Sequence, residues 1–341
     1  MMLKNAFSAT AKLLGPFLLA LSLSGCVEEQ DFNDTPRGNI EALWKIMDER
    51  YCFFNEKEVD WNKVRAEYLS QVSDRMSDGQ LFELMTQMLS QLKDGHVNLY
   101  APFDIGRYWN WHEDYPSNLS DTLLSTYLKT DYRIASGIQY RVLDDNIGYM
   151  RCASFTSDIG AGNLDEILSY LAPCNGLIID IRGNGGGMVT SAEELAARFV
   201  NETTLVGYIR HKTGKAHDAF SDYEPQLLKP AKGIRWQKNV VVLANRQVFS
   251  AANEFVKYLK QCPKAQVIGD QTGGGAGLPF TSELPNGWGV RLSACPMYDA
   301  QKQCTEGGIA PDISVSLTYE DFLWGRDTLI EYARKMLSSA P

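Results

Sequence analysis

The sequence predicts an α/β protein with a mainly parallel sheet, preceded by a small N-terminal helical domain. Two observations support this fold class. From about residue 141 onward, short continuous apolar runs such as "GLIIDIR" and "NVVVLA" alternate with segments of helical spacing. Runs of this kind are typical of strands that are covered on both faces, as in parallel sheets. Between residues 39 and 100, by contrast, the apolar positions recur mostly at helical spacing.

The composition is that of a globular protein with a large core. The chain has 341 residues, of which 44% are hydrophobic and 22% charged, enough for one large domain or two modest ones. Its formal net charge is -9, and no run rich in Lys and Arg interrupts this acidic balance. We therefore expect no nucleic-acid partner.

The first 26 residues have the form of an export signal. Lys4 and Lys12 precede an apolar stretch that is too short to span a bilayer stably. The stretch ends in "LSGC", which resembles a bacterial lipobox and implies that Cys26 becomes a lipid-modified N-terminus. An ordinary signal peptide with an incidental cysteine is the alternative. We expect an exported bacterial lipoprotein, anchored in the outer membrane and facing the periplasm or the exterior, with 27–38 as a flexible acidic tether.

Residues 39–100 are predicted to form the helical domain. One face carries Ile40, Leu43, Trp44, Met47 and Tyr51, a middle helix follows Trp61, and a third contains Leu81, Leu84, Met85, Met88 and Leu92. Ser77 and Gln80 have the spacing of a capping box, and Gly95 could end the last helix. The connector 101–140 is rich in aromatic and polar residues and has no clear period.

Residues 141–341 are predicted to form the core. Strands are expected at "NIGYMRC", "GLIIDIR", "TTLVGYIR", "NVVVLA" and "AQVIG", and helices at "LDEILSYL", "SAEELAARFV" and after Ser250. Asn286-Gly287 lies between alternating runs and predicts a hairpin. A final helix is expected at "YEDFLWGRDTLIEYARKML".

The cysteines and histidines give no sign of a metal site. After Cys26 there are six cysteines, and none of their spacings is that of a zinc site. Export permits disulfides, and Cys295 and Cys304 flank a short polar segment that they could close. We expect neither a metal nor an organic cofactor.

Two stretches could carry chemistry. Ser250 stands where a buried strand gives way to a helix, and its simplest interpretation is a helix N-cap. Gly185, Gly186 and Gly187 follow another strand, where successive amides could bind an anion or an oxyanion, or simply form a turn. Neither phosphate-loop pattern follows that strand.

Six motifs in order resemble the C-terminal processing peptidases and the tricorn core protease. They are "LKDGHVNLY", "GLIIDIRGNGGG", "VVVLANRQVFSAANEF", "VIGDQTGGGAG", "LPNGWGVRL" and "EGGIAPDISV". The resemblance implies a catalytic core similar to the ClpP/crotonase superfamily and a serine-type endopeptidase acting on peptides or unfolded proteins. Many relatives carry a PDZ module before the core, but residues 100–146 are too few for one.

The resemblance also implies residue roles. Ser250 matches the nucleophile, with the amides of Ala251 and of Gly185 or Gly186 as the oxyanion hole. His96 matches the general base of the tricorn-like branch. Glu306 matches the acidic residue that orients this histidine.

Two departures from the family pattern narrow this assignment. The C-terminal processing branch uses a lysine at about Gly275, and no lysine occurs between Lys264 and Lys302, which argues against a Ser-Lys dyad. In tricorn a serine precedes the histidine and bridges to the glutamate, whereas Gly95 stands here. The alternatives are a non-catalytic peptide- or lipophile-binding protein of the same fold, like the retinoid-binding relatives, and an esterase or crotonase-type acyl enzyme.

Overall fold

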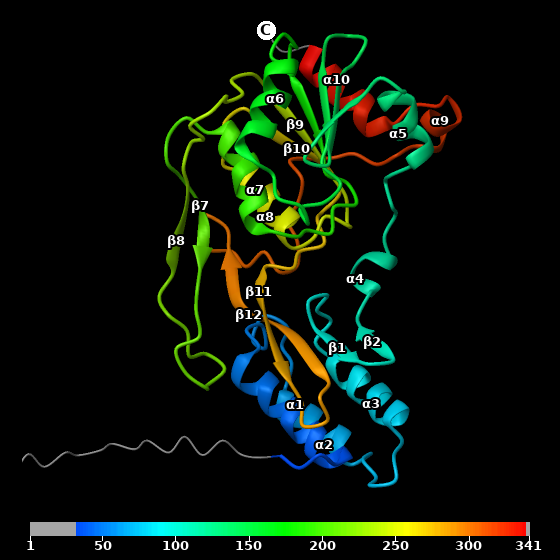
Figure 1. Ribbon diagram of the computed structural model, residues 1–341, viewed down its shortest axis with the longest axis vertical. Helices are drawn as coiled ribbons and strands as arrows, with labels where there is room; N and C mark the ends of the chain where they lie inside the picture. The colour runs from blue at the N-terminus through cyan, green and yellow to red at the C-terminus, as the bar shows by residue number, and fades with distance from the viewer. Residues whose placement is uncertain (1–31, 339–341) are drawn as a thin grey trace, which may run out of the picture. The chain divides into compact units, whose positions relative to one another are not determined.

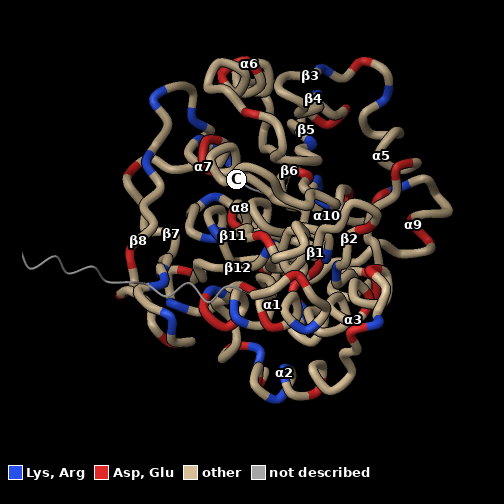
Figure 2. Tube along the Cα trace, turned by 60° about the horizontal axis from the view of Figure 1, so that its bottom comes forward, with Lys and Arg blue, Asp and Glu red and all other residues tan. Residues whose placement is uncertain are grey.

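The computed structural model describes residues 32–338, which belong to one compact unit that begins at Phe32. The predicted signal peptide, the lipidation site Cys26 and residues 27–31 of the tether lie outside the described residues. No helix within 32–338 is long and apolar enough to cross a bilayer. Lys and Arg are interspersed with Asp and Glu along this part of the trace and form no continuous basic stripe there (Figure 2).

Three helices open the described chain: α1 (Pro36–Arg50), α2 (Trp61–Leu69) and α3 (Asp78–Ser90). The capping box at Ser77 and Gln80 is confirmed, since both of its hydrogen bonds are present. The apolar faces of these helices pack together against Leu99, Val290 and Leu292. These three residues belong to strands, so the helical region is packed onto a sheet (Figure 1).

That sheet is antiparallel and has the order β2-β1-β12-β7-β8, with β11 also paired to β12. Its strands are β1 (Asn98–Ala101), β2 (Asp104–Arg107), β7 (Thr204–Ile209), β8 (Glu224–Leu228), β11 (Gly277–Glu283) and β12 (Gly289–Tyr298). The hairpin predicted at Asn286-Gly287 joins β11 to β12 and is confirmed. "TTLVGYIR" does form a strand, β7, but it pairs antiparallel with β8 and β12. Its partly exposed residues suit an antiparallel sheet that is covered incompletely.

The second sheet has the order β13-β10-β9-β6-β5-β4-β3 and is mostly parallel, as predicted. Its strands are β3 (Arg133–Ala135), β4 (Ile138–Val142), β5 (Gly148–Arg151), β6 (Leu177–Asp180), β9 (Val240–Ala244), β10 (Ala265–Gly269) and β13 (Ile313–Ser314). The pairs from β13 to β5 are parallel, and β4 and β3 add an antiparallel edge. Every residue of β6 and β9 is buried, which explains their continuous apolar sequences.

Helices cover both faces of this second sheet (Figure 1). Val240, Val242 and Ala244 of β9 pack in one cluster with α6 (Ala161–Leu171), α7 (Val189–Ala196) and α8 (Ala251–Leu259). Val241 and Leu243 point to the other face, toward α5 (Asp121–Leu128) and α10 (Thr328–Ser338). A 3-10 turn, η1 (Ala197–Phe199), extends α7, and the short α4 (Asn110–Glu113) lies in the connector.

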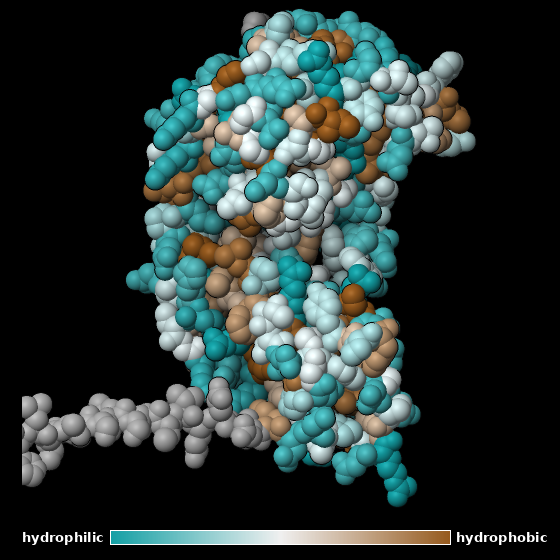
Figure 3. Space-filling view, in the orientation of Figure 1, coloured by the Kyte–Doolittle hydropathy of each residue, from teal (hydrophilic) through white to brown (hydrophobic). Residues whose placement is uncertain are grey.

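The single final helix predicted from residue 319 is wrong. The segment forms α9 (Tyr319–Leu323) and α10, because Gly325 takes a φ of +67° and the Asp327 carboxylate accepts from the amides of Leu329 and Ile330 at the start of α10. The apolar side chains of α9 are exposed, and Figure 3 shows them at the edge of the molecule where Figure 1 places α9.

Candidate active site

Ser250 stands in a strained turn between β9 and α8. Its φ of 57° and ψ of -124° lie outside the common regions for a non-glycine residue, and its amide is fixed by a 2.8 Å bond to the Gly274 carbonyl. The side chain makes no capping bond to the helix. Instead, Oγ lies 3.0 Å from Nε2 of His96. Ser250 therefore occupies the N-cap position of α8 without capping the helix through its side chain, and its hydroxyl is directed at an imidazole.

His96 lies between α3 and β1 and is only 3% exposed. Its ring packs against Phe249, with centroids 4.7 Å apart. Burial lowers the pKa of His96 to about 4, with smaller lowering effects of Arg291 and Lys57 and an opposing effect of Asp94. The imidazole is thus neutral at pH 7 and can accept a proton. Its Nδ1 is buried and has no hydrogen-bond partner among the described residues.

The Asp94 carboxylate fixes the loop that carries His96 through hydrogen bonds, a role that the sequence did not predict. Its Oδ1 accepts the backbone amide of His96 at 2.7 Å. Its Oδ2 accepts hydroxyl bonds from Tyr51 at 2.9 Å and Ser293 at 3.0 Å. The only signal in the sequence is the position of Asp94 inside "LKDGH", two residues before the histidine.

Glu306 is near this cluster, but its bonds lead elsewhere. Oε1 lies 3.0 Å from Nζ of Lys57, and Oε2 accepts the Ala276 amide at 2.9 Å. Burial and the negative charge of Asp94 raise the pKa of Glu306, against the opposing effect of Lys57. No hydrogen bond joins Glu306 to His96 in the described chain. An orienting role for Glu306 therefore stays a prediction.

The two departures from the family pattern have a steric explanation. A Cβ on Gly95 would lie 2.6 Å from Nε1 of Trp111, and a Cβ on Gly275 would lie 2.5 Å from the Phe249 ring. Trp111 and Phe249 stack on each other with centroids 4.3 Å apart. These two rings fill the space in which a serine at 95 or a lysine at 275 would begin.

The two glycines predicted for the oxyanion hole differ in the hydrogen bonding of their amides. The Gly186 amide already donates to Asn184 Oδ1 at 2.9 Å, whereas the amides of Gly185 and Ala251 have no acceptor among residues 32–338. Gly186 has a φ of +97°, and a Cβ there would lie 2.8 Å from the Ser250 Cβ. Glycine at 186 is thus what lets the loop approach the serine.

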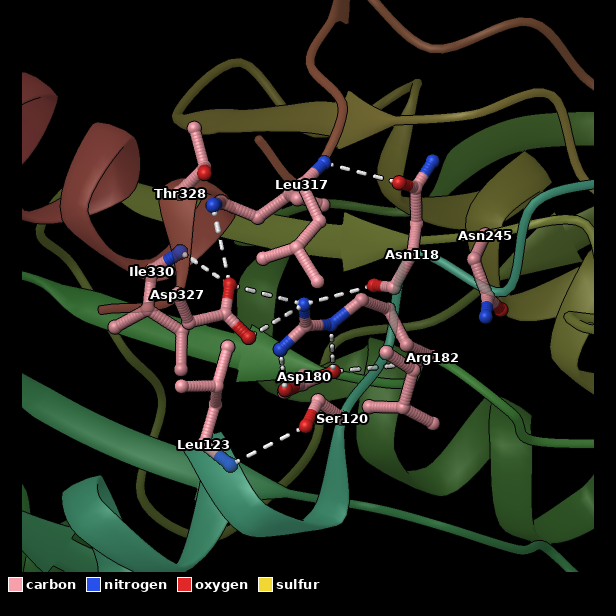
Figure 4. A network of polar contacts seen from close by, with 12 residues as sticks. Asn118, Ser120, Leu123, Asp180, Arg182, Asn245, Leu317, Asp327, Thr328 and Ile330 are labelled. Atoms are coloured by element: carbon pink, nitrogen blue, oxygen red, sulfur yellow. Dashed lines mark hydrogen bonds and ion pairs between the residues drawn. The ribbon is translucent and has the colours of Figure 1, made fainter. Parts of the chain in front are cut away.

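A buried ion network fixes the strand that leads into this loop (Figure 4). Arg182 donates to Asp180 on one side and to both carboxylate oxygens of Asp327 on the other, at 2.7 to 3.1 Å. It also donates to the carbonyl of Asn118, whose Oδ1 accepts the Leu317 amide. The network joins β6 to the connector and to the start of α10.

Ser250, His96, Gly185 and Gly186 line one cleft of about 680 Å³. Within residues 32–338 no group of three or more His, Cys, Asp or Glu is arranged to hold a metal ion. The six described cysteines are all unpaired, so the possible link between Cys295 and Cys304 is absent.

Comparisons with known proteins identify the family of the chain. Peptidase family S41 matches residues 146–315, and the tricorn protease C1 domain matches residues 32–90. The crystal structure of a candidate peptidase from Parabacteroides merdae is 48% identical, with a TM-score of 0.87 over 91% of this chain and 100% of that chain. Mature CPAF bound to lactacystin has a TM-score of 0.67 over 89% of this chain and 97% of that chain, at 12% identity, which shows a shared fold.

Curated relatives are more distant. The carboxy-terminal processing protease CtpA of Bacillus subtilis is 25% identical over 193 residues, which are 56% of this chain and 39% of the relative. A carboxy-terminal-processing protease of Bartonella bacilliformis is 26% identical over 62% of this chain and 48% of its own length. The chain thus spans less than half the length of these two relatives.

Proposed function

Because the chain belongs to peptidase family S41, we propose that it is a serine endopeptidase that forms an acyl-enzyme on Ser250. The observation that carries this proposal is the 3.0 Å contact between Ser250 Oγ and His96 Nε2. A hydroxyl is a weak nucleophile unless a base within hydrogen-bond reach accepts its proton. His96 is neutral at pH 7, because burial lowers its pKa to about 4, and can act as this base.

Peptide hydrolysis then follows in two steps. His96 Nε2 takes the Ser250 proton as Oγ attacks the scissile carbonyl, and the oxyanion accepts hydrogen bonds from the amides of Ala251 and Gly185. The protonated imidazole next gives its proton to the leaving amine, which departs and leaves the acyl-enzyme. Water, deprotonated by His96, attacks the ester carbonyl, and Oγ leaves with the returned proton.

Asp94 acts in this scheme as a positioning residue. Its carboxylate accepts a hydrogen bond from the backbone amide of His96 and so fixes the position of the imidazole relative to Ser250. The unpartnered Nδ1 of His96 would carry the proton of the required tautomer. Glu306 is proposed to support the same loop through its ion pair with Lys57, and we retain it as the candidate third member of the site.

We propose peptides and unfolded polypeptides as substrates. The cleft is large enough for an extended segment of several residues, with the catalytic pair on its wall. The curated relatives are named for processing at the carboxy terminus. From that description we take only the polypeptide substrate, because the cleft of this chain supports no more.

The test is labelling by a fluorophosphonate probe together with hydrolysis of a peptide panel. Protein lacking residues up to Cys26 should be labelled, and Ser250→Ala and His96→Ala should abolish labelling and peptide cleavage. The matched controls Ser169→Ala and His211→Ala, on exposed positions, should keep both. A folded parent that stays unlabelled would contradict the proposal and favour a non-catalytic binding protein. Cleavage of simple esters or thioesters but of no peptide would favour an esterase or a crotonase-type acyl enzyme.

We also propose that Cys26 is lipid-modified and anchors the enzyme to the outer membrane. The support is the lipobox-like "LSGC" alone. Cells expressing the full chain and fed an alkyne fatty acid should yield labelled protein in the membrane fraction, and Cys26→Ser should lose label and membrane association together. Protease added to intact cells then distinguishes a surface position from a periplasmic one. Label retained by Cys26→Ser would contradict the anchor.

A further inference from the structure

Three polar residues form a row across three neighbouring strands of the antiparallel sheet. Asn98 of β1 lies opposite Arg107 of β2 and opposite Arg291 of β12. Residues directly opposite each other in a sheet project from the same face. The next residues along, Leu99 and Val290, project from the other face and are fully buried under the helices. The row of Arg107, Asn98 and Arg291 therefore lies on the face that the helices leave free.

That free face forms a wall of the catalytic cleft. Asn98, Arg107 and Arg291 line the same cavity as Ser250 and His96. Arg291 is close enough to His96 to contribute to the lowering of its pKa, which agrees with a position beside the reacting groups. Arg107 lies over the ring of Trp109, with 4.8 Å from Cζ to the ring centroid, and this contact supports its guanidinium at the rim.

Both guanidinium groups lack an acidic partner in the part of the chain that the structure describes. Arg65, Arg141, Arg151, Arg182, Arg198 and Arg334 are all paired with carboxylates there, whereas no ion pair involves Arg107 or Arg291. Two strand spacings separate the two arginines, about 10 Å, which two such long side chains can bridge. Two like charges directed at one cavity repel each other unless an anion lies between them.

We propose that Arg107, Asn98 and Arg291 form a substrate subsite that binds a carboxylate, from either an acidic side chain or a chain terminus. The guanidinium fork matches a carboxylate with two parallel hydrogen bonds. Between the arginines, Asn98 Nδ2 donates one N–H to the Gly95 carbonyl at 3.3 Å and keeps its second N–H as a neutral donor. The net charge of -9 repels acidic peptides at long range, and a local subsite of this kind offsets that repulsion within the cleft. The inference rests on the proposed function in taking a peptide as the occupant of the cleft.

Binding to Ser250→Ala protein tests the subsite without depending on hydrolysis. Fluorescent pools of short random peptides are compared by anisotropy: amidated peptides without Asp or Glu, the same peptides with a free carboxylate terminus, and amidated peptides with one internal Asp or Glu. At least one carboxylate pool should bind about tenfold more tightly than the neutral pool, the effect of about 1.4 kcal/mol expected for a charge-assisted hydrogen bond. Which pool gains identifies the source of the carboxylate.

Substitutions assign the preference to the row. Arg107→Gln and Arg291→Gln, each on the Ser250→Ala background, should each reduce the preference, and the double variant should abolish it. Arg291→Lys should keep part of it, because charge remains while the fork is lost. The control is Arg133→Gln. Arg133 belongs to the edge strand β3, and its guanidinium lies over the ring of Tyr170. Thermal unfolding of each variant verifies that it is folded.

Two results would overturn the inference. One is equal binding of all three pools, including no binding by any, and the other is a carboxylate preference that survives in the double variant. Hydrolysis of the same pools by the parent protein is measured separately. Absent hydrolysis with an intact, arginine-dependent preference would contradict the proposed peptidase activity and leave the subsite standing, so the two failures are distinguishable.

Discussion

Lys57 Nζ lies 3.0 Å from Glu306 Oε1, and this buried ion pair joins a turn after α1 to the loop that precedes β13. Burial disfavours the charge of Lys57, but Glu306 and Asp94 outweigh that effect and raise its pKa. The ammonium is therefore paired with Glu306 and is also attracted by the charge of Asp94. It stabilises both of them, and its loss would leave negative charge buried without compensation.

Replacing Lys57 should therefore destabilise the fold more than replacing both members of the pair. We expect Lys57→Met to lower the free energy of unfolding by roughly 3–5 kcal/mol, because it leaves a buried carboxylate without its partner. Lys57→Met combined with Glu306→Gln should cost less than Lys57→Met alone. The exposed pair of Lys215 and Glu49 is the control, and Lys215→Met should change little. Urea unfolding measures all four proteins, and equal losses in the single and double variants would contradict the coupling.

Activity should persist to an unusually low pH before it is lost in acid. The base works only when deprotonated, and burial lowers the pKa of His96 to about 4, so the rate of fluorophosphonate labelling should stay level from pH 7 down to about pH 5 and fall by half near pH 4. Arg291 contributes to this lowering, so Arg291→Gln should move the midpoint upward. Arg133→Gln should not move it. A midpoint near 6.5, the ordinary value for histidine, would refute the buried neutral base.

Gly95→Ser should introduce the serine expected from the resemblance to tricorn and yet destabilise the protein. A serine Cβ at this position would lie 2.6 Å from Trp111 Nε1, so the indole must move out of its stack on Phe249. Overpacking of this kind costs about 1–3 kcal/mol. Adding Trp111→Leu should make the serine less costly, because the space at position 95 is then free. A double-mutant cycle on thermal stability measures the interaction, and strict additivity would show that Trp111 is not the obstacle.

Arg182 should be indispensable to stability although it lies outside the cleft. Its guanidinium is fully buried and bonded to Asp180 and Asp327, so Arg182→Met leaves Asp327 buried without a counter-charge and Asp180 with Arg151 as its only ion-pair partner among the described residues. We expect a loss of roughly 3–5 kcal/mol by chemical unfolding. Arg326→Met, which removes an exposed partner of Asp321, is the control and should have little effect. A small loss for Arg182→Met would contradict the role of the network shown in Figure 4.

The sequence predicted those parts of the fold that local patterns determine. The apolar run Val240–Ala244 is a strand covered on both faces, and the capping pair of Ser77 and Gln80 starts a helix where expected. Nothing local distinguishes β7 as a strand of the other sheet, because its partners β8 and β12 lie up to about 90 residues away in the chain. Sheet membership of this kind depends on tertiary packing.

The residues of the candidate site also divide into those that the sequence predicted and those that it did not. Motif order alone brought Ser250 and His96 into one hypothesis, and the structure has their side chains in contact. The Lys57 pairing with Glu306 could not be foreseen, because Lys57 lies in a turn without period and carries no motif. Trp111 was missed for the same reason, since it belongs to the aperiodic connector and its role depends on tertiary contacts with Gly95 and Phe249.

The nucleophile and the base are 154 residues apart, and they come from the borders of two different sheets. His96 is held at the start of β1, whose partner β12 ends only at Tyr298. A chain that emerges from the ribosome therefore lacks a working site until almost all of it has been synthesised. We expect this topology to keep an unfinished protease from cutting itself and its neighbours.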